Sequence, residues 1–363
     1  MTDNVPFVEA MMSQPKLLGR IEEHLRELSA VDLPVWEDGM TLGVLAMGAS
    51  RNSSHALVAA LAVQGVRAVN PPASEILLAR PGFSPADYLL IVSESGRSPE
   101  PLEAARRIGG PRRVAITNFP ESPIAEVVDA TVGFGGVPDS RVYTVGYAAT
   151  LVAYAHIADR LGLRPLDSDV SNVASLVAEA LHRYGEQAAH VGEWIAGASG
   201  VDVAGRGVSF ASAAEFALML REGVRLPSAL YETYEYLHGP MEAVSGSTVV
   251  VLFGDGREAT LPDRLVDAGV RVILITSAAA GSVQAEGHPL LEIIRLPPDL
   301  SPFMRPIVEI VIGQLILVAA SERSEIVLDD FVFEGLGTKL DARSRPPREA
   351  GWASEVGSHQ MLY

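Results

Sequence analysis

The sequence lacks cysteine altogether and holds only two lysines, Lys16 and Lys339, among its 363 residues. The absence of cysteine excludes disulfide bonds, thiolate nucleophiles and thiolate-bound metals. Positive charge is also scarce, since the chain has 28 Lys and Arg but 45 Asp and Glu, which gives a formal net charge of −17 at pH 7. Nucleic acids and anionic membranes need basic faces, so we expect neither as a partner. An anionic ligand would need a locally positive site made of arginines, backbone amides and helix N-termini.

Long uninterrupted apolar runs are missing as well. The most apolar stretches carry charges or end at Gly and Pro before about 18 residues, and the N-terminus lacks a basic segment followed by an apolar one. We therefore expect a cytoplasmic protein that spans no membrane. With 48% hydrophobic residues the chain can bury large cores, and its length at roughly 150 residues per domain predicts about two domains.

One hydroxyl-rich turn stands out, the stretch SESGRS from Ser93 to Ser98. It follows the apolar run Tyr88 to Val92, which is typical of a buried parallel strand. Ser98 and Pro99 then resemble an N-cap and a first helical proline. A strand, a turn rich in hydroxyls and a helix N-terminus direct N–H and O–H donors at one point, which favours a phosphate site. The turn also fits a simpler role, in which Ser98 only caps its helix.

Short apolar runs alternate with helical patterns along the chain. This alternation predicts an α/β fold of doubly wound, mainly parallel sheets flanked by helices. An amphipathic helix is expected near Lys16 to Leu28. Strands are expected at Leu42–Met47, Tyr88–Val92, Val114–Ile116 and Thr131–Phe134, and helices at Thr144–Leu161 and Val170–Gly197. The last helix is Ala-rich and without strand character, so it would connect two domains.

The same succession of strand, Gly-containing turn and helix occurs twice. The similar segments are 87–118 with 247–277, and 42–61 with 201–220. We therefore expect two copies of one α/β unit. In the first copy the Gly turn Met47 to Asn52 would share a ligand with the hydroxyl-rich turn, because the ends of neighbouring parallel strands face one crevice. In the second copy the turn Phe253 to Glu258 holds two acids and no hydroxyl, which disfavours an anion there.

These residues resemble the tandem sugar isomerase (SIS) family, which includes the isomerase half of glucosamine-6-phosphate synthase, SIS-type glucosamine-6-phosphate deaminases and fructosamine-phosphate deglycases. Ser93 to Ser98 is similar to the family's Ser-Gln-Ser-Gly-Glu-Thr phosphate loop, and Gly48-Ala49-Ser50 to its Gly-Thr-Ser. The stretch 205–240, with Arg-Glu at a helix end and a closing Leu-His-Gly-Pro, is similar to the signature of the second domain. The resemblance covers nearly the whole chain and implies two tandem SIS domains.

On this basis we expect five segments along the chain. They are an N-terminal helical segment (1–36), a first SIS domain with the phosphate loop (37–165), a helical connector (166–199), a second SIS domain (200–335) and a C-terminal tail over the active site (336–363). The family's catalytic tail lysine falls at about Arg348, and Lys339 is the only lysine nearby. The resemblance thus places Arg348 or Lys339 near the sugar.

The resemblance also assigns roles to individual residues. It implies a hexose 6-phosphate or aminosugar phosphate in the first domain, with the phosphate on Ser50, Ser93, Ser95 and Ser98 and the sugar on Ala49, Glu94 and Arg97. Glu222 would move a proton between C1 and C2, a task that suits a carboxylate, and His238 would assist ring opening. Glu215 lies seven residues before Glu222, and Glu235 lies three residues before His238. Each would share a helical face with the residue that it precedes and would support it. Without the resemblance, the simpler roles are a solvated acid for Glu222 and a helix cap for His238.

We therefore expect an enzyme, an aminosugar-phosphate deaminase or isomerase that needs no metal or organic cofactor. Without a cysteine, glutamine-dependent amination by this chain alone is not expected, so ammonia would enter or leave free. Glu94 and Arg97 replace the family's Gln and Glu, which suits an amine-bearing substrate or a local ion pair. The alternatives are a fructosamine-6-phosphate deglycase and a non-catalytic sugar-phosphate-binding regulator.

An aromatic-rich run, expected to be helical, lies between Glu222 and His238. It contains Tyr231, Tyr234, Tyr236 and Leu237. This composition is typical of a buried interface, and the family resemblance implies that the histidine is donated across a dimer. We therefore expect a homodimer with shared active sites. In the alternative, the tyrosines pack on their own domain and His238 serves its own site.

Overall fold

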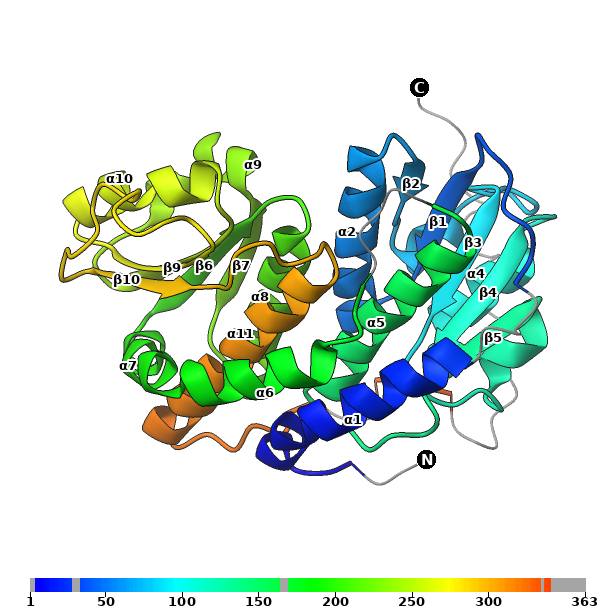
Figure 1. Cartoon of the computed structure of the whole chain (residues 1–363), viewed down its shortest axis with the longest axis horizontal. Helices are drawn as coiled ribbons and strands as arrows, with labels where there is room; N and C mark the ends of the chain where they lie inside the picture. Colours follow the sequence, from blue (N-terminus) through cyan, green and yellow to red (C-terminus); the bar gives the residue numbers. More distant parts are fainter. Residues whose placement is uncertain (1–3, 28–32, 164–168, 334–335, 341–363) are drawn as a thin grey trace, which may run out of the picture.

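The structure, a computed structural model, describes residues 4–27, 33–163, 169–333 and 336–340. Two five-stranded sheets stand on opposite sides of the molecule with helices between them (Figure 1). All strand pairings in both sheets are parallel. The strand orders, β2-β1-β3-β4-β5 and β7-β6-β8-β9-β10, are the same when each sheet is numbered along the chain. The expected doubly wound α/β architecture with two sheets in tandem is confirmed.

The first sheet is built from short buried runs. Its strands are β1 (Thr41–Leu45), β2 (Arg67–Val69), β3 (Tyr88–Val92), β4 (Arg112–Thr117) and β5 (Ala130–Gly133). Its helices are α1 (Phe7–Glu27), α2 (Gly48–Val63), α3 (Ala73–Ile76), α4 (Pro99–Arg107), the 3-10 helix η2 (Pro123–Val127) and α5 (Val145–Arg160). The strand β3 has the predicted bounds. The strand β2 was not expected, because its three residues are largely exposed and carry no apolar pattern.

The second sheet follows the same plan. Its strands are β6 (Gly200–Gly205), β7 (Ser228–Glu232), β8 (Thr248–Phe253), β9 (Arg271–Thr276) and β10 (Leu291–Arg295). The helices are α6 (Val173–Arg183), α7 (Gly185–Ala196), α8 (Ser209–Gly223), α9 (Thr233–Leu237), α10 (Pro262–Asp267) and α11 (Met304–Ser324), with the 3-10 helices η3 (Pro240–Ala243) and η4 (Arg257–Thr260). Segments matched in the sequence, such as 87–118 and 247–277, occupy equivalent places in the two sheets.

Two helices differ from the sequence expectation. Helix α1 begins at Phe7, earlier than predicted, because its buried stripe continues on both sides of Pro15. The single helix expected over 170–197 is broken into α6 and α7 at Tyr184. The ring of Tyr184 is buried, and its hydroxyl donates to the carbonyl oxygen of Arg295 at 2.8 Å. The break therefore anchors the connector to the second sheet.

The aromatic run between Glu222 and His238 is not one helix. Tyr231 lies in β7, and the helical part is the short α9. Tyr236 is fully buried, its hydroxyl donates to Asp202 Oδ2 at 3.1 Å, and its ring centroid lies 5.1 Å from that of Tyr231. Two of the three rings thus pack within their own domain, while Tyr234 stays 45% exposed.

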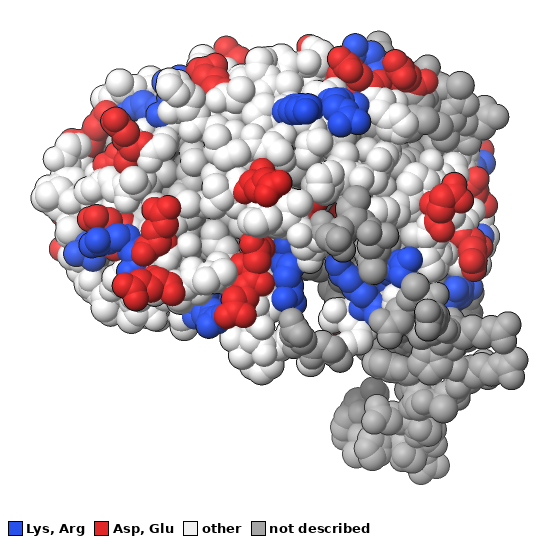
Figure 2. All heavy atoms as spheres, turned by 90° about the horizontal axis from the view of Figure 1, so that it is seen from below, with Lys and Arg blue, Asp and Glu red and all other residues white. Residues whose placement is uncertain are grey.

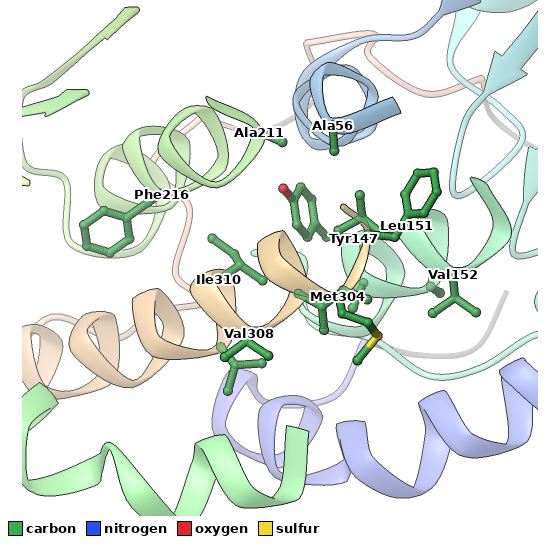
Figure 3. Close-up of a cluster of buried hydrophobic side chains, with 14 of the residues drawn as sticks. Ala56, Tyr147, Leu151, Val152, Ala211, Phe216, Met304, Val308 and Ile310 are labelled. Atoms are coloured by element: carbon green, nitrogen blue, oxygen red, sulfur yellow. The ribbon is translucent and has the colours of Figure 1, made fainter. Parts of the chain in front are cut away.

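A continuous apolar core joins the two sheets. It is made where α2 and α5 of the first sheet meet α8 and α11 of the second, and its buried residues come from both halves of the chain. Figure 3 shows Ala56, Tyr147, Ala211 and Ile310 converging from these four helices. The core therefore fixes the end of α8 beside the first sheet.

Helix α11 is long and apolar enough to cross a membrane by length and composition alone. Its most apolar window has a mean hydropathy of 1.6, but 72% of that window is buried inside the fold. It also carries Arg305 and the fully buried Glu309. These properties are those of a core helix.

Candidate active site

The strand order of the first sheet reverses between β1 and β3. These two strands end side by side, since Leu45 pairs with Ile91. Helix α2 begins at Gly48, directly after β1, and α4 begins at Pro99, after the turn that follows β3. Two helix N-termini therefore border one crevice, at the point where open α/β sheets bind ligands. The two turns singled out from the sequence form this crevice.

The hydroxyls of the hydroxyl-rich turn bond to one another. Ser93 Oγ donates to Ser98 Oγ at 3.1 Å and accepts the backbone N–H of Ser98 at 3.4 Å, and Ser95 Oγ accepts the N–H of Arg97 at 3.3 Å. Ser98 is the N-cap of α4, but its side chain makes no capping hydrogen bond to the described residues of that helix. Since its oxygen accepts from Ser93, its own proton is left for a ligand. Simple capping is therefore not the role of this hydroxyl.

Glycine is required at the tip of the same turn. Gly96 has a φ of +60°, and a Cβ there would lie 1.7 Å from Ser122 Oγ. Its N–H donates to the Ser93 carbonyl at 2.9 Å, and its carbonyl accepts from the Ile124 N–H at 3.2 Å. These contacts hold the turn in one shape against η2.

The second turn places a basic residue at the start of α2. Ala49 is buried and Ser50 is half-buried in the first helical turn. The Nε of Arg51 donates to the Asn70 carbonyl at 3.3 Å, which holds the guanidinium beside this helix end. Arg97 is half-buried in the other turn. The two turns that border the crevice therefore carry two helix N-termini and two arginines, groups of the kind that an anion site in an acidic protein needs.

A cavity of about 1180 Å³ opens beside the hydroxyl-rich turn. Its basic lining residues are Arg141, Arg221, Arg225 and Lys339, and Glu94, Ser95, Tyr143 and Glu222 also line it. Of the predicted phosphate ligands, Ser95 lines this cavity directly, whereas Ser93, Ser98 and Ser50 belong to the crevice beside it. Figure 2 shows basic side chains on both sides of a notch in the lower edge of the molecule, with acidic side chains next to them on one side.

Glu222 stands in this cavity near the end of α8, and burial raises its pKa to about 7. It forms no hydrogen bond or ion pair with the other residues that the structure describes. Burial raises the pKa of Glu215, on the same helix, to about 8, and its Oε2 accepts from Asn52 Nδ2 at 3.0 Å. A half-buried carboxyl with a pKa near 7 can take up and release a proton at neutral pH.

His238 lies away from Glu222 in its own chain. It is exposed at the end of α9, as is Glu235, and neither lines the cavity. The contact between them is a backbone bond from the His238 N–H to the Glu235 carbonyl at 3.0 Å. The structure therefore brings Glu222, Glu94 and Ser95 together but not the histidine.

The equivalent edge of the second sheet is filled by the protein's own charged groups. Asp255, in the turn after β8, accepts from Arg305 Nη2 at 2.9 Å. Glu309 is fully buried, and its two oxygens accept from Ser209 Oγ at 2.7 Å and Ser212 Oγ at 2.6 Å in the first turn of α8. The side chain of Glu309 therefore already occupies this helix N-terminus.

Sequence reasoning did not assign Tyr143 and Asn118 to the site. The Tyr143 hydroxyl donates to Glu94 Oε2 at 3.2 Å, and Asn118 Nδ2 donates to Glu94 Oε1 at 2.9 Å. Both oxygens of Glu94 are thus used within the protein, and neither bonds to Arg97. The position of Asn118 directly after β4 is the one signal that the sequence offered. Arg348 lies outside the described residues, whereas Lys339 reaches the cavity.

Comparison with known proteins relates the chain to a family of sugar isomerase domains. Residues 195–320 match the SIS domain family. The isomerizing glutamine–fructose-6-phosphate aminotransferase of Sulfurisphaera tokodaii is 24% identical over 233 residues, which are 62% of this chain and 38% of that protein. The chain therefore spans less than two fifths of the length of this relative.

Solved structures share the fold over most of the chain. The C-terminal domain of glucosamine-fructose-6-phosphate aminotransferase from Francisella tularensis has a TM-score of 0.71 at 18% identity and covers 89% of this chain and 97% of that one. Glucosamine-6-phosphate deaminase from Thermotoga maritima has a TM-score of 0.69 at 18% identity, over 90% and 97% of the two chains. The chain is therefore similar to SIS-domain proteins in sequence over residues 195–320, and it shares their fold of two α/β domains in tandem over most of its length.

Proposed function

We propose that this chain is an enzyme acting on a hexose 6-phosphate, as an aminosugar-phosphate isomerase or deaminase. The observation that carries the proposal is the position of Glu222, a carboxyl with a pKa of about 7, in a cavity that it shares with Ser95 of the hydroxyl-rich turn. The names of the relatives, which concern fructose 6-phosphate and glucosamine 6-phosphate, support the same substrate class.

The phosphate would bind in the crevice between β1 and β3. Its oxygens would accept from the hydroxyls of Ser50, Ser93, Ser95 and Ser98 and from the free amides of α2 and α4. Ala49 and Arg97 would contact the sugar. The adjoining cavity would hold the reacting carbons, and it carries the basic lining that offsets the acidity of the protein as a whole.

Glu222 would act as the general base. It would take the proton from C2 of an open-chain aldose, and the electron pair would pass to the carbonyl oxygen. The proton would return to C1, while the proton on the C2 oxygen or nitrogen passes to the C1 oxygen. With an amine at C2, the same transfer leaves an imine, which water hydrolyses to a ketose and free ammonia. A positioned base contributes about 10² to 10⁴ in rate. Glu215, held by Asn52, would support the helix face that carries Glu222.

We further propose a homodimer with shared sites. His238 is exposed and outside the cavity of its own chain, so a second copy is the available route for it to reach a sugar. The Glu222→Gln and His238→Ala variants are each expected to be nearly inactive. After co-refolding, statistical mixing would restore up to about a quarter of normal activity, because half the dimers would carry one intact site of two. Mixed dimers seen by native mass spectrometry that recover no activity would exclude a shared site.

The size of the cavity favours a second candidate, a fructosamine-6-phosphate deglycase. At about 1180 Å³ the cavity exceeds the range of about 300 to 1000 Å³ found for drug-sized ligands, so it has room beyond a hexose. That room is lined by Phe331 and Phe333 together with Arg221 and Arg225. An amino acid attached to the amine of the sugar would fit such a lining, with its carboxylate on an arginine.

The decisive experiment presents both substrate types to the purified protein. Glucosamine 6-phosphate and fructosamine 6-phosphates bearing amino acids would be incubated in deuterated buffer, with NMR following deuterium at C1 and C2 and assays following ammonia and free amino acid. Release of ammonia from the first indicates a deaminase, and release of amino acid from the second a deglycase. Glu222→Gln should bind normally without exchange, whereas Glu322→Gln, an exposed acid on α11, should behave as wild type. Calorimetric binding without any exchange would mean a regulator.

A further inference from the structure

The Tyr143 hydroxyl bridges the hydroxyl-rich turn and the C-terminal segment. It donates to Glu94 Oε2 at 3.2 Å and accepts from Lys339 Nζ at 2.9 Å, and the Lys339 nitrogen lies 5.4 Å from the centroid of the Tyr143 ring. The next residue, Leu340, donates its backbone N–H to the Arg97 carbonyl at 3.0 Å. Lys339 is therefore tied to the turn through both its side chain and its neighbouring backbone.

The Tyr143 bridge is itself rigidly supported. Asp139 is buried and accepts the backbone N–H groups of Thr144 at 3.1 Å and Gly146 at 2.7 Å, which fixes the start of α5 next to Tyr143. A Cβ at Gly146 would meet Glu94 Cγ at 3.1 Å, so the Glu94 side chain packs closely against that helix start. Both ends of the Tyr143–Glu94 hydrogen bond thus have little freedom.

The bonding pattern explains why an acid stands at position 94. Asn118 Nδ2 donates to one oxygen of Glu94 and the Tyr143 hydroxyl donates to the other. A carboxylate can accept both bonds, whereas a glutamine has one acceptor oxygen and would present its amide N–H groups to a second donor. The negative charge also balances the Lys339 ammonium at the far side of the phenol.

We propose that Glu94 and Tyr143 are positioning residues, which hold the Lys339 ammonium in the cavity where Glu222 would remove the proton from the sugar. This inference rests on the proposed function. The electron pair released from the C–H bond moves to the carbonyl oxygen, and the ammonium donates a hydrogen bond to the oxyanion so formed. Lys339 has three N–H donors and uses one on Tyr143, which leaves two for the sugar. The proton on Glu222 then returns to the neighbouring carbon, and the proton on the C2 oxygen or nitrogen passes to the C1 oxygen, so atoms and charge balance.

Steady-state kinetics test the proposal on the best substrate of the panel above. Lys339→Ala is expected to lose about 10²-fold or more in kcat, the size of effect found for one lost oxyanion donor. Tyr143→Phe and Glu94→Gln are expected to lose about 10-fold or more in kcat with KM changed less than about threefold. Tyr147→Phe serves as the matched control, because that phenol is buried on α5, makes no hydrogen bond with the described residues and does not line the cavity.

Two further readouts separate positioning from a merely structural role. Adding Tyr143→Phe to the Lys339→Ala variant should lower kcat little further, because the phenol acts through the lysine. Added ethylammonium should restore part of the activity of Lys339→Ala but not of the Tyr143→Phe/Lys339→Ala variant. Thermal midpoints equal to that of the wild type would show that the variants fold. If Glu94→Gln does not fold, the kinetics of Tyr143→Phe test the proposal.

The outcomes distinguish the two levels of the proposal. Suppose that the wild type exchanges the sugar hydrogen with solvent. If Tyr143→Phe then keeps full kcat, or if the kcat losses of Tyr143→Phe and Lys339→Ala multiply in the double variant, the positioning role is overturned and the enzyme assignment stands. If the wild type exchanges hydrogen with no sugar phosphate of the panel, the proposed function falls, and the positioning role falls with it.

Discussion

Replacing Glu222 by glutamine should make the protein more stable and catalytically inactive at the same time. Burial raises the pKa of this carboxyl from its ordinary 4.5 to about 7. The folded chain therefore binds the proton more tightly than the unfolded chain does. By linkage, the contribution of Glu222 to stability is fully present below about pH 4.5 and is lost as the pH rises through about 7. Above that pH the ionised carboxylate is held in the cavity at a cost to the fold.

The magnitude follows from the two pKa values. Their difference, at about 1.36 kcal/mol per unit, gives an upper bound of about 3 kcal/mol at pH 8. The glutamine side chain carries no such penalty, so Glu222→Gln should gain up to this amount at pH 8 and almost nothing at pH 4.5. At about 2 to 4 °C per kcal/mol for a domain of some 150 to 250 residues, Tm should rise by up to about 10 °C.

Thermal unfolding at pH 4.5 and 8, followed by circular dichroism, measures this difference directly. The Glu322→Gln variant supplies the control, because an exposed acid on α11 should shift Tm by little at either pH. A Glu222→Gln variant that is no more stable than the wild type at pH 8, or that gains equally at both pH values, would refute the reasoning. The carboxyl would then be better solvated than its position near the end of α8 indicates.

Three other perturbations address the turn and the tail. Ser95→Ala together with Ser98→Ala should weaken hexose 6-phosphate binding by about 10-fold or more, since hydrogen bonds to charged groups contribute about 1.5 to 3 kcal/mol each; unchanged calorimetric affinity would exclude these hydroxyls as ligands. Gly96→Ala should lower stability by about 1 to 3 kcal/mol through its positive φ alone, with a further cost from the Ser122 clash, and a normal Tm would show that the turn adapts. Deletion from Ser344 onward, which removes Arg348 and keeps Lys339, should abolish turnover with little change in Tm, and full activity in the truncated chain would exclude Arg348 from the site.

The crevice between β1 and β3 could be predicted from the sequence because the segments that form it are local. A buried strand, a turn of hydroxyls and glycine, and a helix opened by Pro99 follow one another within twenty residues, from Tyr88 to Arg107. Parallel pairing of β1 with β3 then brings the second turn alongside. Each step depends on neighbours along the chain or on a general rule of α/β sheets, so no distant contact had to be known.

The other half of the site depends on contacts between distant residues. Tyr143 and Lys339 are 196 positions apart, and nothing near either residue indicates the other. The sequence suggested that Glu94 faces an amine or pairs with Arg97, whereas the structure gives its oxygens to Asn118 and Tyr143. Such pairings follow from how residues 336–340 lie against the first domain, which is set by packing rather than by local pattern.

In the second sheet, the buried carboxyl of Glu309 fills the place that corresponds to the crevice between β1 and β3. Ser209 and Ser212 lie at the start of α8 with the Arg305 guanidinium beside them, and an incoming anion would need such donors. Both hydroxyls donate to the side chain of Glu309 instead. A neutral residue at position 309 would leave these donors vacant. A single substitution at position 309 would thus open a second crevice bordered by hydroxyl and guanidinium donors, while the crevice between β1 and β3 stays unchanged.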